Sequence, residues 1–266
     1  MHHVVARAAP GTLLFRTWIE AQALWTRLAE IPAISALVLM PNHIHLLAPD
    51  VREPAFTRLM SGYARWRNHR RGERGPVWQP HPPFHEVPDE SHTRRTRRYI
   101  HLNPCRAGLA QDPLAWPFST HRDVTGLTVK AVVRRSGDAA AFHAYVSADP
   151  TVCVEGTWLP QGSAGPHTSV SAVEAAVSAM TRLTISGLRA RGPGRTLLIQ
   201  ALRVHTTASA TGIAEHLGMD PASVYRTHTG PRDDLRRVER AIGDPRFPAL
   251  EDGDQRSAWG RYARWR

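Results

Sequence analysis

The feature that most constrains the fold is an apolar segment, residues 34–48, which is interrupted near its middle by Pro41 and Asn42. Small and apolar residues precede the break, and the extended, apolar character resumes from Ile44 to Ala48. Because proline and asparagine favour turns, the segment predicts two strands joined by a very short connection. Helical patterns flank these strands, so the segment favours an α+β fold with helices layered on a sheet.

Two histidines, His43 and His45, flank a single apolar residue at the start of the second of these strands. Successive strand residues point to opposite faces, so both imidazoles are expected on one face, as two ligands of one metal ion. A chain with 15 histidines in 266 residues contains about one such pair by chance, so the spacing alone is weak evidence. The apolar context adds weight, because an imidazole that is buried without a partner is costly, and binding a metal ion is one way to satisfy it.

A second segment, residues 89–104, predicts a helix that carries Tyr99. Short polar residues at 89–91 are suited to cap its start, and Pro104 is expected to end it just after Asn103. Tyr99 and Asn103 lie four residues apart, so a helix places both side chains on one face. The turn before the tyrosine is crowded by four arginines, Arg94, Arg95, Arg97 and Arg98.

A tyrosine that acts as a nucleophile must lose a proton from a group whose ordinary pKa is about 10. The arginines before Tyr99 would supply a positive field and a grip on phosphate, and Asn103 would supply an oxygen ligand for the metal. Two imidazoles and one amide oxygen leave positions open on Mg²⁺ or Mn²⁺ for a phosphate group. Three simpler explanations remain open: a half-buried packing tyrosine, a solvated basic helix face, and an asparagine that merely ends the helix.

The other elements of the first part of the chain alternate between strand and helix patterns. A first strand is predicted at Val4 and Val5, and helices are predicted over 17–30 and 54–71, the first with a capping-box pattern at its start. A further short strand is predicted at 77–79, before a proline-rich loop.

The chain carries 34 Lys+Arg against 23 Asp+Glu, a formal net charge of +11, and Lys130 is its single lysine. Arginine's planar fork suits phosphate, so nucleic acid is the expected partner, although a GC-rich genome also enriches arginine. Cys105 and Cys153 show no metal or redox spacing, which favours reduced thiols in a cytoplasm. Without a signal-peptide core or an apolar run of membrane-spanning length, the chain is expected to be soluble, cytoplasmic and free of membrane contact.

The carboxy-terminal half divides by composition. Residues around 148–170 are rich in Pro, Gly, Ser and Thr and lack periodicity, which predicts a linker. The linker would separate a first domain, 1–147, from a helical domain, 171–245, and a basic tail, 246–266.

Residues 213–226 have the pattern of a helix-turn-helix, with buried apolar positions in two short helices and Gly218 at the turn. Ser223, Tyr225 and Arg226 would then be exposed on the second helix and face a DNA groove. The alternative is a helical hairpin that only packs against its neighbours.

Four blocks of this sequence, taken together and in order, resemble the HUH single-tyrosine transposases, and in particular the REP-associated tyrosine transposases. The matching blocks cover residues 38–47, 75–79, 99–109 and 116–120, which read VLMPNHIHLL, GPVWQ, YIHLNPCRAGL and WPFST. The sequence departs from the family at Cys105, where a small β-branched residue is more usual, and in its proline-rich stretch at 80–88.

The resemblance implies a ferredoxin-like antiparallel sheet with helices packed on it, followed in many members by a helical DNA-binding tail. It implies that His43 and His45 bind Mg²⁺ or Mn²⁺, with Asn103 as a third polar ligand, and that Tyr99 is the nucleophile. Members of the family cleave single-stranded DNA next to imperfect hairpins, form a 5′-phosphotyrosine link and release a 3′-hydroxyl. Arg106, inside the third block, joins the four arginines before Tyr99 as an expected DNA contact.

The first hypothesis is therefore a nucleoid-associated enzyme that nicks and rejoins DNA. A monomer is expected from its hairpin-specific relatives, with a dimer as the alternative. A second hypothesis is a regulator that binds DNA without cutting it, and a third is a metal-dependent phosphohydrolase that uses activated water. The presence of His43, His45 and Tyr99 favours the first, because a regulator does not need them.

Overall fold

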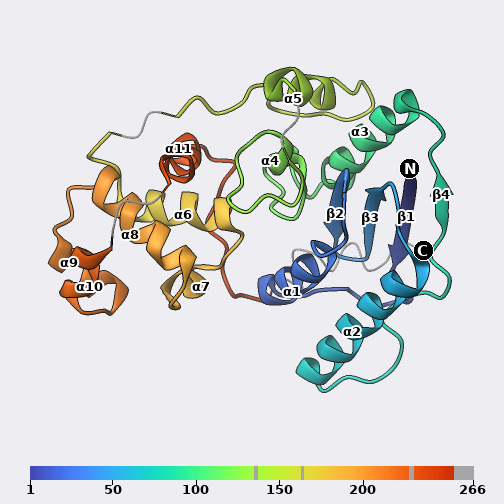
Figure 1. Cartoon of the computed structure of the whole chain (residues 1–266), viewed down its shortest axis with the longest axis horizontal. Helices are drawn as coiled ribbons and strands as arrows, with labels where there is room; N and C mark the ends of the chain where they lie inside the picture. Colours follow the sequence, from blue (N-terminus) through green and yellow to red (C-terminus); the bar gives the residue numbers. More distant parts are fainter. Residues whose placement is uncertain (135–136, 163–164, 228–230, 255–266) are drawn as a thin grey trace. The chain divides into compact units, whose positions relative to one another are not determined.

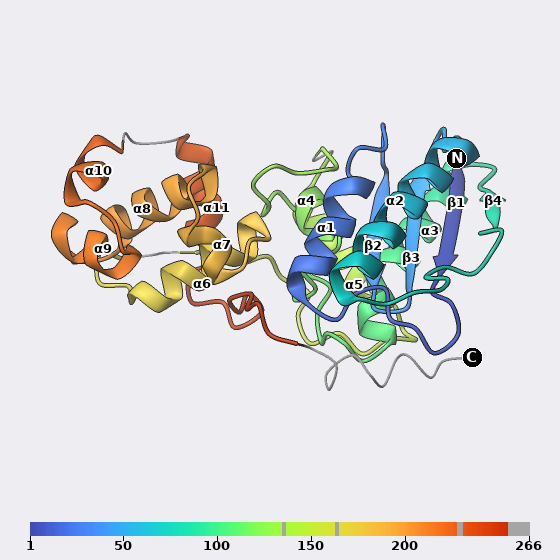
Figure 2. The same cartoon turned by 90° about the horizontal axis from the view of Figure 1, so that it is seen from below.

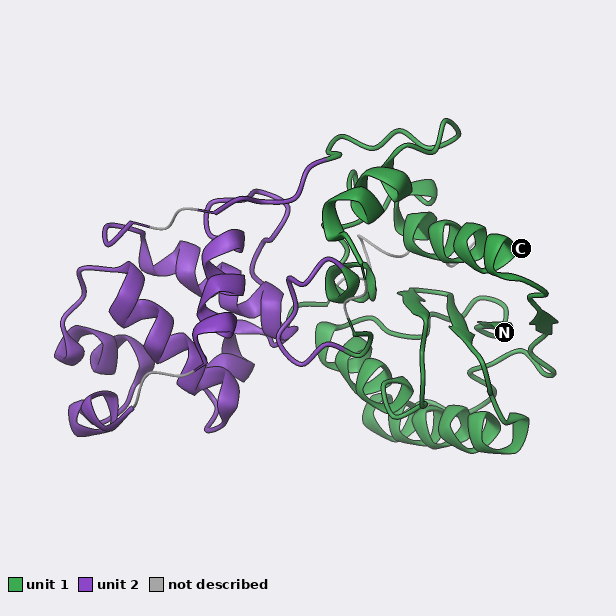
Figure 3. Ribbon diagram, turned by 45° about the horizontal axis from the view of Figure 1, so that its top comes forward, with its two compact units in different colours: residues 1–124, 132–157, 253–266 green, residues 125–131, 158–252 purple. Residues whose placement is uncertain are grey.

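The computed structural model describes residues 1–134, 137–162, 165–227 and 231–254, and Figure 1 traces its elements in chain order. The chain forms two compact units, which Figure 3 colours separately. Of the described residues, the first unit holds 1–124, 132–134, 137–157 and 253–254, and the second holds 125–131, 158–162, 165–227 and 231–252.

The segment expected to be a linker is divided between these units, since 148–157 belongs to the first and 158–170 to the second. Of the expected basic tail, residues 246–252 belong to the second unit and 255–266 lie outside the described residues. The assignment of a separate DNA-binding domain to the second unit stays a prediction.

Within the described residues, four strands form one antiparallel sheet in the order β2-β3-β1-β4. The strands are β1 (His2–Arg7), β2 (Ala36–Met40), β3 (His43–Ala48) and β4 (Phe84–Glu86). β2 and β3 form the hairpin that the sequence predicts, joined only by Pro41 and Asn42. This sheet and the helices between its strands confirm the α+β class.

Two expectations about strands were wrong. β4 lies inside the proline-rich stretch, where no strand was predicted; it is a short edge strand, and proline is tolerated around such edges. The strand predicted at 77–79 contributes only an isolated bridge between Ala8 and Trp78, just beyond the end of β1.

Helices cover both faces of the sheet (Figure 1, Figure 3). α1 (Trp18–Leu28) and α2 (Glu53–Arg71) pack together on one face, and α3 (Glu90–Arg106) packs on β2 and β3 from the other. The predicted capping box is present at the start of α1. On α2, Tyr63 is fully buried and donates its hydroxyl hydrogen to the carbonyl of Leu14 at 2.7 Å.

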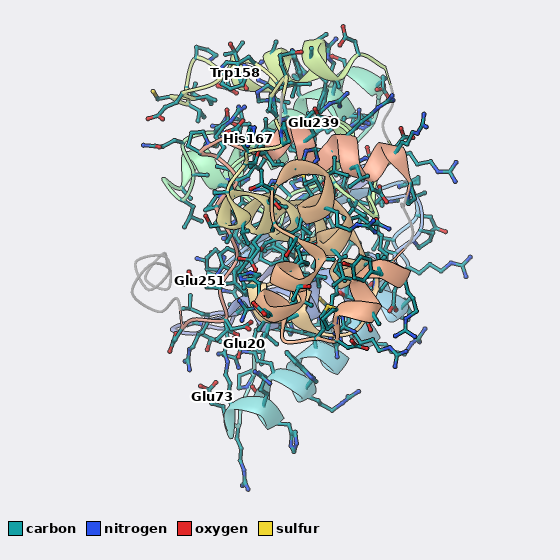
Figure 4. The ribbon with its side chains drawn as sticks, turned by 90° about the vertical axis from the view of Figure 1, so that its left-hand side faces the viewer. Glu20, Glu73, Trp158, His167, Glu239 and Glu251 are labelled. Atoms are coloured by element: carbon teal, nitrogen blue, oxygen red, sulfur yellow. The ribbon has the colours of Figure 1, made fainter. Side chains whose placement is uncertain are left out.

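A buried ion pair ties α1 to α2. Arg71 donates to the two carboxylate oxygens of Glu20 at 2.6 and 2.7 Å, and Arg16 and Arg67 hold Glu73 just beyond α2. Figure 4 labels both glutamates. Burial raises the pKa of Glu20, but hydrogen bonds from Arg71 and from the backbone of Arg16 outweigh it, so the pKa lies below its ordinary value. The helix layer opposite α3 is therefore fixed by charge as well as by apolar packing.

The start of α3 is capped by Asp89, whose carboxylate accepts from the backbone of His92 at 2.8 Å. The predicted end of this helix was wrong, because α3 continues through Pro104 to Arg106. Proline removes only one hydrogen-bond donor from the helix. The last turn is still closed, because the Ala107 N–H donates to the Asn103 carbonyl at 3.0 Å and the Leu109 N–H donates to the Pro104 carbonyl at 2.8 Å.

The first unit also contains α4 (His121–Val124) and α5 (Ala139–Ser147), and α5 packs on α3. Cys105, near the end of α3, is partly buried, and burial together with nearby Asp112 raises its pKa to about 12. Cys153 is exposed, and neither thiol is in a disulfide. The Cys105 thiol therefore stays protonated at neutral pH.

The second unit is helical throughout the elements that the structure describes. Its helices are α6 (Val170–Thr181), α7 (Ile185–Arg189), α8 (Pro193–His205), α9 (Ala210–Leu217), α10 (Pro221–Arg226) and α11 (Arg232–Ala241). α9 ends at Gly218, which adopts φ 62°, and α10 follows at once with Asp220 as its cap. Among the described helices, none combines the length and the apolar character that crossing a membrane requires.

Candidate active site

The two predicted histidine ligands lie side by side on the sheet face that α3 covers. The register of β1 and β3 pairs Arg7 with His43 and Val5 with His45, and residues paired across strands share a face. The two imidazole centroids are 4.8 Å apart with their planes almost perpendicular, and His45 is 3% exposed. The alternation expected from the sequence therefore brings both rings to one place.

Each of these imidazoles has a hydrogen-bond partner at its Nδ1 atom. His43 Nδ1 lies 2.7 Å from Asn42 Oδ1, and His45 Nδ1 lies 3.0 Å from His3 Nε2. Burial, helped by the charge of Arg7, lowers the pKa of His43 to about 4. Burial also lowers the pKa of His45 well below its ordinary value. Both rings are therefore neutral near pH 7, the state in which a ring nitrogen can bind a metal.

α3 places Tyr99 and Asn103 above these histidines, one helical turn apart. Asn103 is 8% exposed and acts as a hydrogen-bond partner of both imidazoles, which raises their pKa values slightly against the effect of burial. Tyr99 is 41% exposed, and its ring centroid lies 5.5 Å from that of His45. A buried amide thus lies one helical turn from an accessible phenol.

These residues offer a donor set of two neutral imidazoles and one amide. Within the described part of the chain, no three His, Cys, Asp or Glu side chains are arranged to hold a metal ion. A cation at His43 and His45 would therefore depend on Asn103 and on water or phosphate oxygens for its other ligands. Such a mixed nitrogen and oxygen set with open positions fits Mg²⁺ or Mn²⁺.

Among the five arginines of α3 that were predicted to contact DNA, Arg106 lies against the Tyr99 ring. Its guanidinium carbon lies 5.4 Å from the centre of the Tyr99 ring, and its Nη2 atom lies 3.0 Å from Asp149 Oδ2. This places a positive charge next to the phenol and leaves the phenol accessible.

The other arginines of α3 are engaged with the protein, except Arg95, which is exposed. Arg94 and Arg98 stack on the Tyr145 ring of α5 at 4.2 and 4.9 Å, and Arg98 also pairs with Asp149. Arg97 donates to Ser35 Oγ at 2.7 Å. The sequence predicted the density of positive charge on this helix. It did not predict that Tyr145 of α5 and Asp149 of the following loop would engage several of these arginines.

Three further residues at this site were not identified from the sequence: His3, Tyr145 and Asp149. His3 stacks on His45, with ring centroids 5.1 Å apart, and burial with the charge of His85 lowers the pKa of His3 to about 4. One signal was available for His3, since it lies two residues before Val5 on the predicted first strand and so shares its face. Nothing local predicts the contacts of Tyr145 and Asp149.

A second histidine group lies on the other side of α3. His101, His121 and His143 are fully buried, and His121 Nε2 lies 2.9 Å from His143 Nδ1. Burial, together with the charge of Arg97, lowers the pKa of His101 to about 3. This group packs against the ring of Phe142 and is sealed from solvent.

In the second unit, the residues predicted to face DNA lie on α10. Tyr225 is 68% exposed, while Ser223 and Arg226 line a cavity of about 960 Å³ together with Arg191 and Arg195. No acidic side chain is among the described residues that line this cavity. Three arginines therefore line the cavity, and one of them, Arg226, also lies 4.0 Å from Asp220 Oδ2 through its Nη2 atom.

No family model and no curated protein matches this chain. Among solved structures, the chain is similar to a REP-associated tyrosine transposase bound to a REP hairpin, with 23% sequence identity and a TM-score of 0.37. The likeness covers 52% of this chain and 85% of that chain. At this level the likeness assigns neither an activity nor a residue role to this chain.

Proposed function

We propose that the first unit is a metal-dependent enzyme that nicks and rejoins single-stranded DNA near hairpins through Tyr99. The observation that carries the proposal is an accessible phenol beside a buried pair of neutral imidazoles, with the Arg106 guanidinium against its ring. The element order βαββαβ and the strand order support a ferredoxin-like core beneath this site.

In the proposed reaction, Tyr99 Oη attacks the scissile phosphorus and the bond from phosphorus to the 3′ oxygen breaks. The phenol gives up its proton, the departing 3′ oxygen gains one, and the 5′ phosphate stays bound to the tyrosine. Rejoining reverses these steps, so no external energy source is needed. Arg106 would stabilise negative charge at the phenol and the phosphate.

His43, His45 and Asn103 would hold the divalent cation. When bound, that cation supplies Lewis-acid polarisation of the phosphate. The exposure of Tyr99 favours this enzyme over the two other candidates, a regulator that binds DNA without cutting it and a hydrolase that uses water, because neither of them needs an accessible phenol next to the histidines.

The test is a denaturing-gel assay with the full chain, labelled single-stranded hairpins and Mg²⁺ or Mn²⁺. A covalent adduct is expected that disappears in Tyr99→Phe and in chelator, but persists in the matched control Tyr145→Phe, which keeps the ring that contacts Arg94 and Arg98. Cleavage without an adduct would support the hydrolase, and binding without cleavage would support the regulator.

We also propose that the helical unit binds the DNA backbone through its basic cavity, with Ser223, Tyr225 and Arg226 at the groove. Three arginines line this cavity and no acidic residue does among the described lining residues, so the cavity matches a phosphodiester chain in charge even though Arg226 Nη2 lies 4.0 Å from Asp220 Oδ2. The double variant Arg195→Ala/Arg226→Ala should weaken DNA binding and reduce the slope of log affinity against log salt by roughly 2. Arg236→Ala on α11, an exposed arginine paired with Asp233, is the control and should change little.

A further inference from the structure

We infer that His3 and Asn42 are positioning residues, which hold His45 and His43 with the Nε2 atom of each ring available to a metal ion. This role rests on the metal site proposed above and adds two side chains that the metal would not touch. Imidazole ligands are commonly oriented through the nitrogen that does not bind the metal, because a hydrogen bond there fixes both the ring plane and the position of the proton.

Asn42 defines the arrangement at His43. Its Oδ1 atom lies 2.7 Å from His43 Nδ1, and an amide oxygen can only accept a hydrogen bond. The proton of the neutral His43 ring is therefore on Nδ1, and the lone pair is on Nε2. Asn42 stands in the two-residue connection between β2 and β3, directly before the first residue of β3, so the turn itself supplies the acceptor.

His3 occupies the equivalent position at His45. In the β1–β3 register Val5 pairs with His45, which makes His3 the diagonal neighbour on the same face. Its Nε2 atom lies 3.0 Å from His45 Nδ1, and the two rings are stacked with an interplanar angle of 25°. The two partners thus act on the same atom, Nδ1, in both histidines.

The contact between His3 and His45 has two forms, since one neutral ring donates and the other accepts. If His3 donates, the proton of His45 is on Nε2 and blocks metal binding there. If His45 donates from Nδ1, its Nε2 lone pair is free, as it is in His43. The proposed role of His3 requires the second form, with His3 as the acceptor, before a metal ion binds as well as after.

The experiment measures Mn²⁺ binding to the full chain by calorimetry and the proton positions of the histidine rings by ¹⁵N NMR. His3→Leu should weaken Mn²⁺ binding by about 10- to 100-fold, the usual cost of losing such a partner. His3→Gln should recover most of the affinity, because its amide oxygen also accepts a hydrogen bond. The control is His2→Leu, the preceding residue on the opposite face of β1, which contacts the carbonyl of Pro49.

The NMR spectra test the orientation of the two histidine rings independently of whether a metal ion binds. Without metal, His43 and His45 of the wild-type chain should both carry the proton on Nδ1, and His3→Leu should mix the two forms at His45 alone. Equal Mn²⁺ affinity of His3→Leu and wild type, or a wild-type His45 protonated on Nε2, would overturn the role of His3. A wild-type chain that has these protons on Nδ1 but binds no Mn²⁺ would refute the metal site and leave the orientation intact.

Discussion

The two histidine groups of the first unit are alike in charge state and opposite in access. His43 and His45 lie under α3 beside an exposed tyrosine, whereas His101 and His121 lie on the other side of the same helix, sealed from solvent. Burial lowers the pKa of His43 and His45 in the first group and of His101 and His121 in the second, so these four rings are neutral near pH 7. Neutral clustered histidines are therefore not sufficient to mark a site; what distinguishes the first group is a reachable phenol and a guanidinium against it.

The largest expected effect separates the two groups by activity. His43→Ala/His45→Ala should reduce metal-dependent adduct formation by more than about 100-fold, since loss of even an outer partner of a metal ligand costs 10- to 100-fold. The gel assay with Mn²⁺ measures this effect. Substantial adduct in the double variant would show that His43 and His45 are no more necessary for the reaction than the sealed histidines.

The converse change should affect stability instead. His121→Leu leaves the buried His143 without a hydrogen bond that it makes in the native chain, which should lower the free energy of unfolding by about 1–3 kcal/mol. Urea denaturation at pH 7 measures the loss. Under folded conditions the adduct yield should match that of the wild type, and a selective loss of yield would show that the sealed group also serves the chemistry.

The pH dependence of stability sharpens the same contrast. Burial, with the charges of His101, His143 and Arg122, keeps the pKa of His121 well below its ordinary value in the folded chain. Below about pH 6.5, His121 binds a proton in the unfolded chain but not in the folded chain. The free energy of unfolding therefore decreases as the pH is lowered, by up to about 1.4 kcal/mol per pH unit. Denaturation at pH 7, 6 and 5 should show a shallower fall in His121→Leu, and equal slopes would contradict the sealed, neutral state.

The smallest expected effect concerns the charges around the accessible group. Asp149 pairs with Arg98 at 3.3 Å and with Arg106 at 3.0 Å. Asp149→Asn should cost less than about 1 kcal/mol of stability. It should strengthen binding of single-stranded DNA roughly 2- to 5-fold at low salt, with a smaller gain as salt rises. Unchanged affinity at low salt would mean that these two arginines do not contact DNA.

The sequence predicted those parts of the candidate site that depend on local periodicity. The break at Pro41 and Asn42 predicted the β2–β3 hairpin, and strand alternation predicted that His43 and His45 share a face. Helical spacing predicted that Tyr99 and Asn103 lie one turn apart. These features follow from a few neighbouring residues, so a single sequence carries them.

The parts that were missed depend on contacts between distant segments. The position of His3 beside His45 is set by the register of β1 against β3, and Asp149 reaches Arg106 only because α5 packs on α3. The end of α3 was misjudged because Pro104 was weighed by its own preference, while the hydrogen bonds of Ala107 and Leu109 close the turn beyond it. Strand register and helix packing thus set the first two contacts, and hydrogen bonds at the end of α3 outweighed the preference of Pro104.

The two thiols of the first unit differ in reactivity, so the native chain can be labelled with a fluorescent dye at a single position. Thiol-reactive dyes couple to the thiolate, and the Cys105 thiol, with its pKa near 12, stays protonated at neutral pH, whereas Cys153 is exposed. A maleimide dye should therefore attach at Cys153 without any engineered cysteine. That position is four residues from Asp149, so the emission of the dye would report in real time whether DNA arrives at the arginines of α3 and how long it stays.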